Sequence, residues 1–260
     1  MNIVSTPIAL VTGASKRIGR AIALALAEDG FDLALHYNHS ADEALSLKAE
    51  IEAMGQRADV FSADLALPEQ TSSLIEAAHL ALGPISLLIN NASVLGRDCL
   101  TDMTLASWRR LIDVNLTSQV FLMQAFSRQE ALPETASIIN MLDQQMAAPS
   151  PRFFSYSVAK IGLEGATRLA AFELAPKVRV NGIAPGLVLR SGNQSDATFR
   201  NIQQSMPLGE GLNPKDIVHA VQYLSNASQV TGEILTVDSG QHLIGPGNSR
   251  LLSEKKEAKP

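Results

Sequence analysis

Short apolar segments alternate with amphipathic segments along almost the whole chain, and a glycine follows each of the first three amphipathic segments. The first cycle consists of an apolar run ending at Val11, a helical pattern over 18–29 and a stop at Gly30. Strands and helices that alternate in this way favour a parallel sheet with helices on both faces. The sequence therefore predicts a doubly wound α/β fold.

The same periodicity predicts the individual elements. Strands are expected at 31–36, 58–62, 85–90, 137–142, 178–183 and 234–237, and helices at 18–29, 41–54, 68–82, 105–131, 154–174 and 216–224. Residues 186–213 are rich in small polar residues, which is typical of a loop that covers a substrate. We expect one catalytic domain over 1–245 and a flexible charged tail over 246–260.

Composition narrows the class of protein. At 260 residues with 46% apolar residues, the chain can bury one large core. A net charge of −5 gives no reason to expect nucleic acid or an anionic membrane as a partner, so we expect a small-molecule substrate. The single cysteine, Cys99, and the absence of a long apolar run predict a cytoplasmic protein, and we predict no metal site. Cys99 itself is expected to be a small apolar side chain and no nucleophile.

The segment 10–19, LVTGASKRIG, joins the first strand to the first helix. Gly13 permits a tight turn, and Gly19 permits close packing or the close approach of a ligand. Free N–H groups at the start of a helix bind phosphate well. The alternative is an ordinary strand-to-helix turn.

Tyr156 and Lys160 lie four residues apart in a predicted helix and so share one face. A neighbouring cation is expected to lower the tyrosine pKa, and such a tyrosine can give a proton to a carbonyl or imine as hydride arrives. Read alone, the pair is a weak signal, because a tyrosine and a lysine four residues apart usually belong to a solvated helix face.

Six motifs in order carry a resemblance that covers residues 8–240. They are Thr12-Gly13 with Gly19, Asn90-Asn91-Ala92, Asn115, Tyr156, Lys160 and Pro185-Gly186. In this order and spacing they resemble the short-chain dehydrogenase/reductase superfamily. The resemblance implies a single Rossmann-type domain with a seven-stranded parallel sheet, a homotetramer, and NAD(H) or NADP(H) as cofactor.

The resemblance also implies roles for particular residues. Tyr156 is the expected proton donor, Lys160 holds the nicotinamide ribose and tunes Tyr156, and Asn115 supports a water that relays protons. The residues expected to bind the cofactor are Gly13, Arg17, Ile18, Gly19, His36, Tyr37, Ser40, Asp64, Leu65, Asn90, Ala92, Lys160, Pro185 and Gly186. Two alternatives stay open: Asn115 as a polar residue inside a helix, and Asp64 as a turn residue before Pro68.

Two departures from the usual family pattern narrow the resemblance. Arg17 stands where most members have a third glycine of the opening turn, and Asp143, thirteen residues before Tyr156, stands where most have serine. Together with residues 36–40, HYNHS, they resemble the pteridine reductase branch, which includes dihydromonapterin reductases. A protonated Asp143 could donate through Tyr156 to a ring nitrogen; the alternative is a simple turn residue.

Residues 36–40 include no carboxylate to accept from a ribose 2′-hydroxyl. Arg17, with His36, His39 and Ser40 as further donors, suits the extra phosphate of NADPH. Two alternatives apply here. The sequence 40–43, SADE, has the form of a helix capping box, and the histidines are equally compatible with exposed loop positions.

One feature weakens the pterin assignment. The branch has an aromatic residue shortly after the Asn-Asn-Ala motif, where this chain has 94–97, VLGR. Arg97 and Arg152 either meet an anionic group or are only solvated. The competing functions are a reductase of 3-oxoacyl thioesters or of another small ketone, and a non-catalytic regulator that binds NADPH.

Two predicted helices are too apolar to bury only one face each, which is the sequence support for an oligomer. Their apolar residues are Trp108, Leu111, Phe121, Leu122 and Phe126 in the first, and Ile161, Leu163, Leu169 and Phe172 in the second. Family members pair these helices between subunits.

Overall fold

The computed structural model describes residues 6–147, 149–190, 192, 194–209 and 211–244. Within them, seven strands form one parallel sheet in the order β3-β2-β1-β4-β5-β6-β7. The strands are β1 (Ile8–Val11), β2 (Asp32–Tyr37), β3 (Ala58–Ser62), β4 (Leu87–Asn90), β5 (Ser137–Met141), β6 (Arg179–Pro185) and β7 (Ile234–Val237). The predicted fold class is confirmed, and the predicted tail over 246–260 lies outside the described residues.

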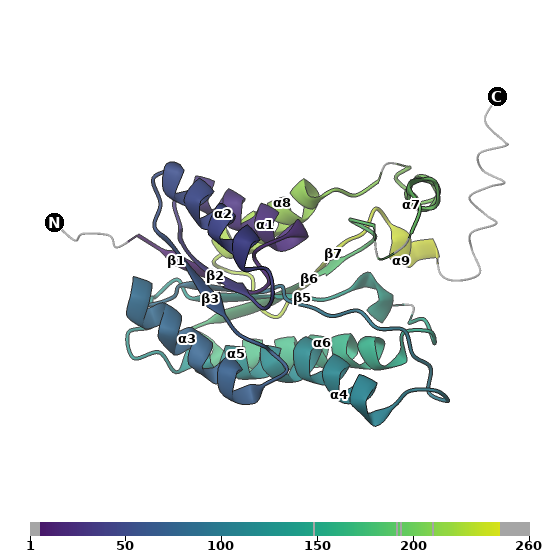
Figure 1. The fold of residues 1–260 in the computed structure, drawn as a ribbon, viewed down its shortest axis with the longest axis horizontal. Helices are drawn as coiled ribbons and strands as arrows, with labels where there is room; N and C mark the ends of the chain where they lie inside the picture. Colours follow the sequence, from purple (N-terminus) through teal and green to yellow (C-terminus); the bar gives the residue numbers. More distant parts are fainter. Residues whose placement is uncertain (1–5, 148, 191, 193, 210, 245–260) are drawn as a thin grey trace.

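Helices cover both faces of the sheet (Figure 1). One face carries α1 (Arg17–Glu28), α2 (Ala41–Ala53) and α8 (Pro214–Asn226), and the other carries α3 (Pro68–Leu82), α4 (Leu105–Ile112), α5 (Ser118–Ser127) and α6 (Phe154–Leu174). Two further helices, α7 (Asp196–Gln204) and α9 (Gln241–Ile244), lie beyond the carboxyl ends of the last strands.

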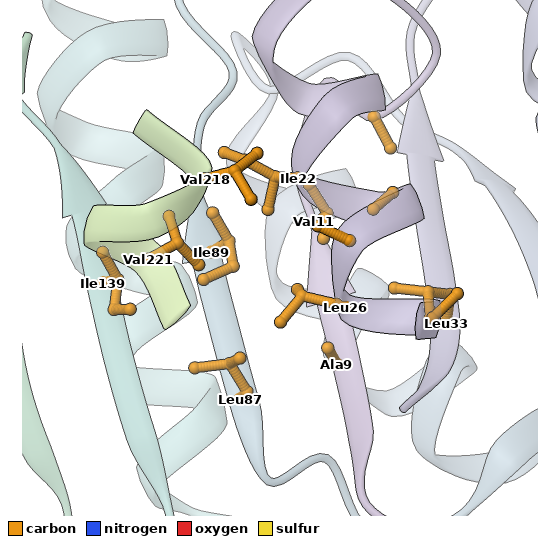
Figure 2. Close-up of a cluster of buried hydrophobic side chains, with 14 of the residues drawn as sticks. Ala9, Val11, Ile22, Leu26, Leu33, Leu87, Ile89, Ile139, Val218 and Val221 are labelled. Atoms are coloured by element: carbon orange, nitrogen blue, oxygen red, sulfur yellow. The ribbon is translucent and has the colours of Figure 1, made fainter. Parts of the chain in front are cut away.

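The sheet separates two hydrophobic cores because side chains alternate between its faces. In β1, Ala9 and Val11 join the core beneath α1 and α8, whereas Ile8 and Leu10 join the opposite core. Figure 2 shows the first of these, with Ile22 of α1 packed over the sheet. Each large aliphatic side chain buried in this way stabilises the fold by about 1.5–3 kcal/mol.

The strand order places a crevice at the middle of the sheet. β1 pairs with β2 on one side and with β4 on the other, so the chain reverses its direction of winding between β1 and β4. Ligands of doubly wound sheets bind outside the carboxyl ends of the strands at this point. The turn after β1 and the segment after β4 therefore meet where a ligand is expected.

The predicted helical stretch over 105–131 is confirmed over 105–127, but it is not one regular α-helix. A π-helical turn, Asp113–Thr117, separates α4 from α5, and α5 ends at Ser127. The side chain of Asn115 donates to the carbonyl of Leu111 at 2.9 Å, and the Ser118 hydroxyl donates to that of Val114 at 2.8 Å. Side chains that bond the backbone in this way compete with the regular helical ladder.

The expected loop over 186–213 contains a helix that its composition does not reveal. The hydroxyl oxygen of Ser195 accepts from the backbone N–H of Thr198 at 3.2 Å and caps the first turn of α7. The cap satisfies one of the N–H groups that a helix start leaves without a partner.

Candidate active site

A cleft of about 450 Å³ opens at the switch point of the sheet. Five segments line it: the turn after β1, the end of β2 with the residues that follow, the loop after β3, the segment after β4, and Arg110 of α4 with Val114 of the π-helical turn. Of the predicted cofactor residues, it brings together Gly13, Arg17, Ile18, Gly19, His36, Asp64, Leu65 and Ala92. The remaining predicted residues lie elsewhere, as described below.

The opening turn requires its two glycines. Gly13 has φ +63°, and a Cβ on Gly19 would lie 2.2 Å from the carbonyl oxygen of Gly13. The first turn of α1 has neither a side-chain cap nor an acidic residue, so the chain leaves its N–H groups free at the cleft. Unpaired N–H groups and the positive end of a helix dipole form a phosphate site.

Arg17 occupies the position of the usual third glycine with φ +56°, a conformation that favours glycine. Its Nη2 donates to the carbonyl oxygen of Arg190 at 2.9 Å. The arginine therefore joins the opening turn to the segment that follows β6, at the cost of about 1–2 kcal/mol of backbone strain.

His36 is not the free donor that we predicted. Its side chain is buried, its Nδ1 accepts from the N–H of Gly13 at 3.0 Å, and its Nε2 lies 3.0 Å from the carbonyl oxygen of Ala63. Burial lowers the pKa of the imidazole, which favours the neutral ring with Nε2–H as donor. His36 thus holds two walls of the cleft together.

The rest of the segment after β2 also differs from prediction. Asn38 and His39 line the cleft, whereas Tyr37 and Ser40 do not. Ser40 makes no capping hydrogen bond because its backbone (φ −100°, ψ 61°) is not extended, so the predicted capping box is absent. Glu43 instead pairs with Lys16 at 2.7 Å.

Asp64 combines both of its predicted alternatives. Its Oδ1 accepts from the N–H of Ala66 at 3.0 Å, which makes it a turn residue, and it also lines the cleft beside Leu65. A carboxylate has lone pairs enough for the turn and for one further donor.

Asn90 does not face the cleft. Its side chain is buried, and its Nδ2 donates to Oδ1 of Asn140 at 2.8 Å. The next residue, Asn91, takes the wall position and donates to the carbonyl oxygens of Thr12 and Gly13. Asn90 therefore ties β4 to β5 behind the wall of the cleft.

Pro185 and Gly186 lie at the end of β6, outside the lining of this cleft. The N–H of Gly186 donates to the carbonyl oxygen of Val237 at 2.9 Å, and a Cβ on Gly186 would lie 2.8 Å from Asp238. The glycine is thus required for contact with the segment after β7.

A second group of polar residues lies at the start of α6. The hydroxyl of Tyr156 donates to Oδ2 of Asp143 at 2.8 Å, and Nζ of Lys160 donates to the carbonyl oxygen of Met141 at 2.6 Å. Nζ of Lys160 also lies 5.9 Å from the centre of the Tyr156 ring. The helical spacing of four and the end of β5 bring all three side chains together, as predicted from the sequence.

Burial dominates the electrostatics of this group. It raises the pKa of Asp143, although hydrogen bonds from Gln145 and Tyr156 and the charge of Lys160 oppose it. Burial, and then the charge of Asp143, raise the pKa of Tyr156 well above its ordinary value, against the fall expected from the lysine alone. Burial lowers the pKa of Lys160 to about 8. Tyr156 therefore keeps its proton at neutral pH.

Asn115 supports the site from behind. Its Oδ1 accepts from the Ser93 hydroxyl at 2.7 Å and from the N–H of Val94 at 3.1 Å, and its Nδ2 donates to two carbonyl oxygens. Ser93 also lies beside Tyr156, where its hydroxyl opposes the rise in the tyrosine pKa. We did not predict Ser93; its place directly after the Asn-Asn-Ala motif was the available signal.

Known proteins resemble this chain over almost its whole length. The sequence profile of the family described as enoyl-(acyl carrier protein) reductase matches residues 13–242. The 3-oxoacyl-acyl-carrier-protein reductase of Synechocystis sp. is 32% identical over 244 residues, which cover 92% of this chain and 98% of that protein. The chain is a short-chain dehydrogenase/reductase. Its family membership makes it an oxidoreductase and confirms the predicted resemblance.

Solved structures also resemble this short-chain dehydrogenase/reductase over almost its whole length. The FolM alternative dihydrofolate reductase 1 of Brucella canis, complexed with NADP, superposes with a TM-score of 0.87 at 36% identity and covers 94% of this chain and 96% of its own. A blue fluorescent protein from a metagenomic library, in complex with NADPH, superposes with a TM-score of 0.83 at 31% identity. The match covers 90% of this chain and 97% of that chain. The similar proteins thus include a 3-oxoacyl-acyl-carrier-protein reductase and an alternative dihydrofolate reductase.

In the part of this short-chain dehydrogenase/reductase that the structure describes, no helix is long and apolar enough to cross a membrane.

Proposed function

We propose that the chain is an NADPH-dependent reductase of the pteridine reductase type, which adds hydride and a proton across a C=N bond of a reduced pteridine. The 2.8 Å hydrogen bond between Tyr156 and the buried Asp143 carries this proposal. Most family members have serine at position 143, which cannot supply a proton as a carboxylic acid does. A ring nitrogen of a pteridine needs such an acid more than a ketone oxygen does.

The cleft fits the proposed cofactor. The free N–H groups at the start of α1 and the glycine turn suit its pyrophosphate, and Leu65, Asp64 and Ala92 line the path of its adenosine half. Arg17 would supply positive charge for the 2′-phosphate, beside residues 36–40, which include no carboxylate. NADPH, when bound, supplies the hydride.

The residues at the start of α6 supply the proton. Tyr156 gives its hydroxyl proton to the substrate nitrogen, and a protonated Asp143 donates to the tyrosine oxygen across the same 2.8 Å contact. The raised pKa of Asp143 keeps part of its population protonated at higher pH than an ordinary carboxyl. Lys160 stabilises the negative charge that develops on Tyr156, and Asn115 with Ser93 holds the wall beside the hydroxyl.

The second candidate is a reductase of 3-oxoacyl thioesters. It is favoured by the identity of 32% to the Synechocystis sp. protein of that name. The same Tyr156 and Lys160 would serve a ketone, whereas Asp143 would have no evident role.

Steady-state oxidation of NADPH by the purified protein tests the proposal, with 7,8-dihydrobiopterin and acetoacetyl-coenzyme A as parallel substrates. We expect turnover of the dihydropterin and a loss of at least about 100-fold in Tyr156→Phe. Turnover of the thioester alone would support the second candidate. Binding of NADPH without turnover of either substrate would support the regulator.

We also propose that the enzyme is a cytoplasmic homotetramer. Phe121 of α5 and Ile161, Leu169 and Phe172 of α6 are exposed, and Phe172 is 89% exposed. α5 and α6 lie in the same helix layer (Figure 1). Exposed apolar side chains on neighbouring helices suit a subunit contact. Light scattering should give four subunits, and Phe172→Glu should dissociate them; a monomeric wild type would contradict this proposal.

A further inference from the structure

The wall of the cleft contains an arginine, Arg110, to which the proposed function gives no role. Arg110 of α4 lines the cleft together with Val114 of the π-helical turn. The two residues lie along one side of this helical stretch because they are four positions apart. The carbonyl oxygen of Arg110 accepts from the N–H of Asp113 inside the stretch, so its side chain is the part that is available to a ligand.

The guanidinium of Arg110 is free. The residue is exposed, and within the described ranges its side chain makes no hydrogen bond or ion pair. The other lysine and arginine of the cleft lining are engaged: Lys16 pairs with Glu43 at 2.7 Å, and Arg17 donates to the carbonyl oxygen of Arg190 at 2.9 Å. Arg110 is therefore the cation of the described lining that has all its donors available.

A carboxylate lies on another wall of the same cleft. Asp64, in the loop after β3, is the only acidic residue among the described residues of the lining. Asp64 and Arg110 form no ion pair in the part of the chain that the structure describes, so the cleft keeps these opposite charges apart. A ligand between the two walls meets a hydrogen-bond acceptor from one side and a planar cation from the other.

The phosphate site of the cleft is built by a different helix layer. The free N–H groups at the start of α1 belong to the layer on one face of the sheet, and α4 belongs to the layer on the other face (Figure 1). Arg110 thus reaches the cleft from the face opposite to the phosphate site. Adenine suits the two groups, because its amine donates to a carboxylate and its electron-rich ring face attracts a guanidinium.

We propose that Arg110 binds the adenine base of the cofactor, with the plane of its guanidinium against the face of the ring. This inference rests on the proposed function, which places NADPH in the cleft. The planar cation carries the role and a point charge does not, so lysine should not replace this arginine. The contact is the same for NADPH and NADH, which share the adenine base and differ in the 2′-phosphate.

Isothermal titration calorimetry of the purified chain with NADPH, NADH and adenosine 2′,5′-bisphosphate tests the inference. We expect Arg110→Gln and Arg110→Lys each to raise Kd for all three ligands about fivefold, the effect of one exposed cation–π contact. The neighbouring Arg109 is also exposed but does not line the cleft, so Arg109→Gln is the matched control for loss of charge. It should change Kd less than about twofold.

The other outcomes separate failure of this inference from failure of the proposed function. If Kd is the same in Arg110→Gln as in the wild type, the adenine contact is wrong and the proposed function stands. If only the two ligands with a 2′-phosphate bind more weakly, and Arg110→Lys binds them as the wild type does, Arg110 binds that phosphate and not the base. If the wild type binds neither NADPH nor NADH, the proposed function is wrong, and the adenine contact with it.

Discussion

The hydroxyl of Tyr156 donates to Oδ2 of Asp143 at 2.8 Å, and both groups are buried in surroundings that disfavour their charged forms. Either group of the pair can therefore supply a proton: the phenol of Tyr156 or the carboxylic acid of Asp143. When Asp143 is protonated, it donates to the tyrosine oxygen and the tyrosine proton can point toward a substrate. This pair distinguishes the chain from relatives with serine at the same position.

Asp143→Asn should remove the acidic proton and keep the hydrogen bond from Tyr156. The amide keeps an oxygen that accepts from Tyr156 but cannot supply a proton, so we expect kcat for the dihydropterin to fall about 100-fold. In the wild type, kcat should fall as pH rises past the raised pKa of Asp143, and this dependence should be lost in the variant. The pH–rate profile is the measurement, with Gln144→Ala as the control from the same turn. A pH–rate profile that is the same in Asp143→Asn as in the wild type would show that Asp143 is only a turn residue.

Lys160 should make stability increase with pH over an unusual range. The unfolded chain holds this proton up to about pH 10.5, and the folded chain up to about pH 8. Between these values the unfolded state binds more protons, so the free energy of unfolding contributed by Lys160 rises with pH, by an amount on the order of 3 kcal/mol. Urea unfolding of the wild type and of Lys160→Met checks this. The difference between them should shift in favour of the wild type from pH 8 to 10; a constant difference would contradict it.

Arg17 should show opposite effects on stability and on cofactor choice. Arg17→Gly relieves a positive φ, so the variant should be as stable as the wild type or more stable by up to about 1 kcal/mol, despite the lost bond to Arg190. Arg17→Ala keeps the strain and should be less stable than Arg17→Gly. Both should lose about tenfold in kcat/KM for NADPH and little for NADH. Unchanged preference for NADPH in both variants would exclude Arg17 from 2′-phosphate binding.

Asp98 should stabilise the helix that carries Tyr156. α6 begins without a side-chain cap of its own, and the buried Oδ1 of Asp98 accepts from the N–H of Ser155 in its first turn. Asp98→Ala should lower the free energy of unfolding by about 1–2 kcal/mol and reduce kcat, and Asp98→Asn should recover part of both. Thermal unfolding and steady-state kinetics measure the two effects. Equal stability of all three proteins would rule out the capping role.

The sheet and the proton-transfer group could be predicted because both depend on local spacing. Alternating periodicity fixes strands and helices, and a spacing of four residues fixes a shared helix face for Tyr156 and Lys160. The predicted helix over 154–174 has the same bounds as α6.

The remaining features depend on contacts distant in sequence. The two ring nitrogens of His36 are occupied by Gly13 and Ala63, which lie on other segments, and the contact of Ser93 with Tyr156 joins residues far apart in the chain. The sign of the Tyr156 pKa shift depends on burial, which spacing alone does not reveal. Asn90, which we predicted to bind the cofactor, is buried and bonded to Asn140, and its neighbour Asn91 lines the cleft.

The most direct test of the account is the ratio of kcat/KM for 7,8-dihydrobiopterin to that for acetoacetyl-coenzyme A, measured in the wild type and in Asp143→Ser. Serine restores the usual family residue and keeps a hydroxyl near Tyr156, so thioester reduction should be preserved or improved while pterin reduction falls. We predict that the ratio drops at least about 100-fold, the contribution expected of a positioned acid. A ratio unchanged by the substitution would contradict the claim that the Asp143 carboxyl defines the reaction of this enzyme.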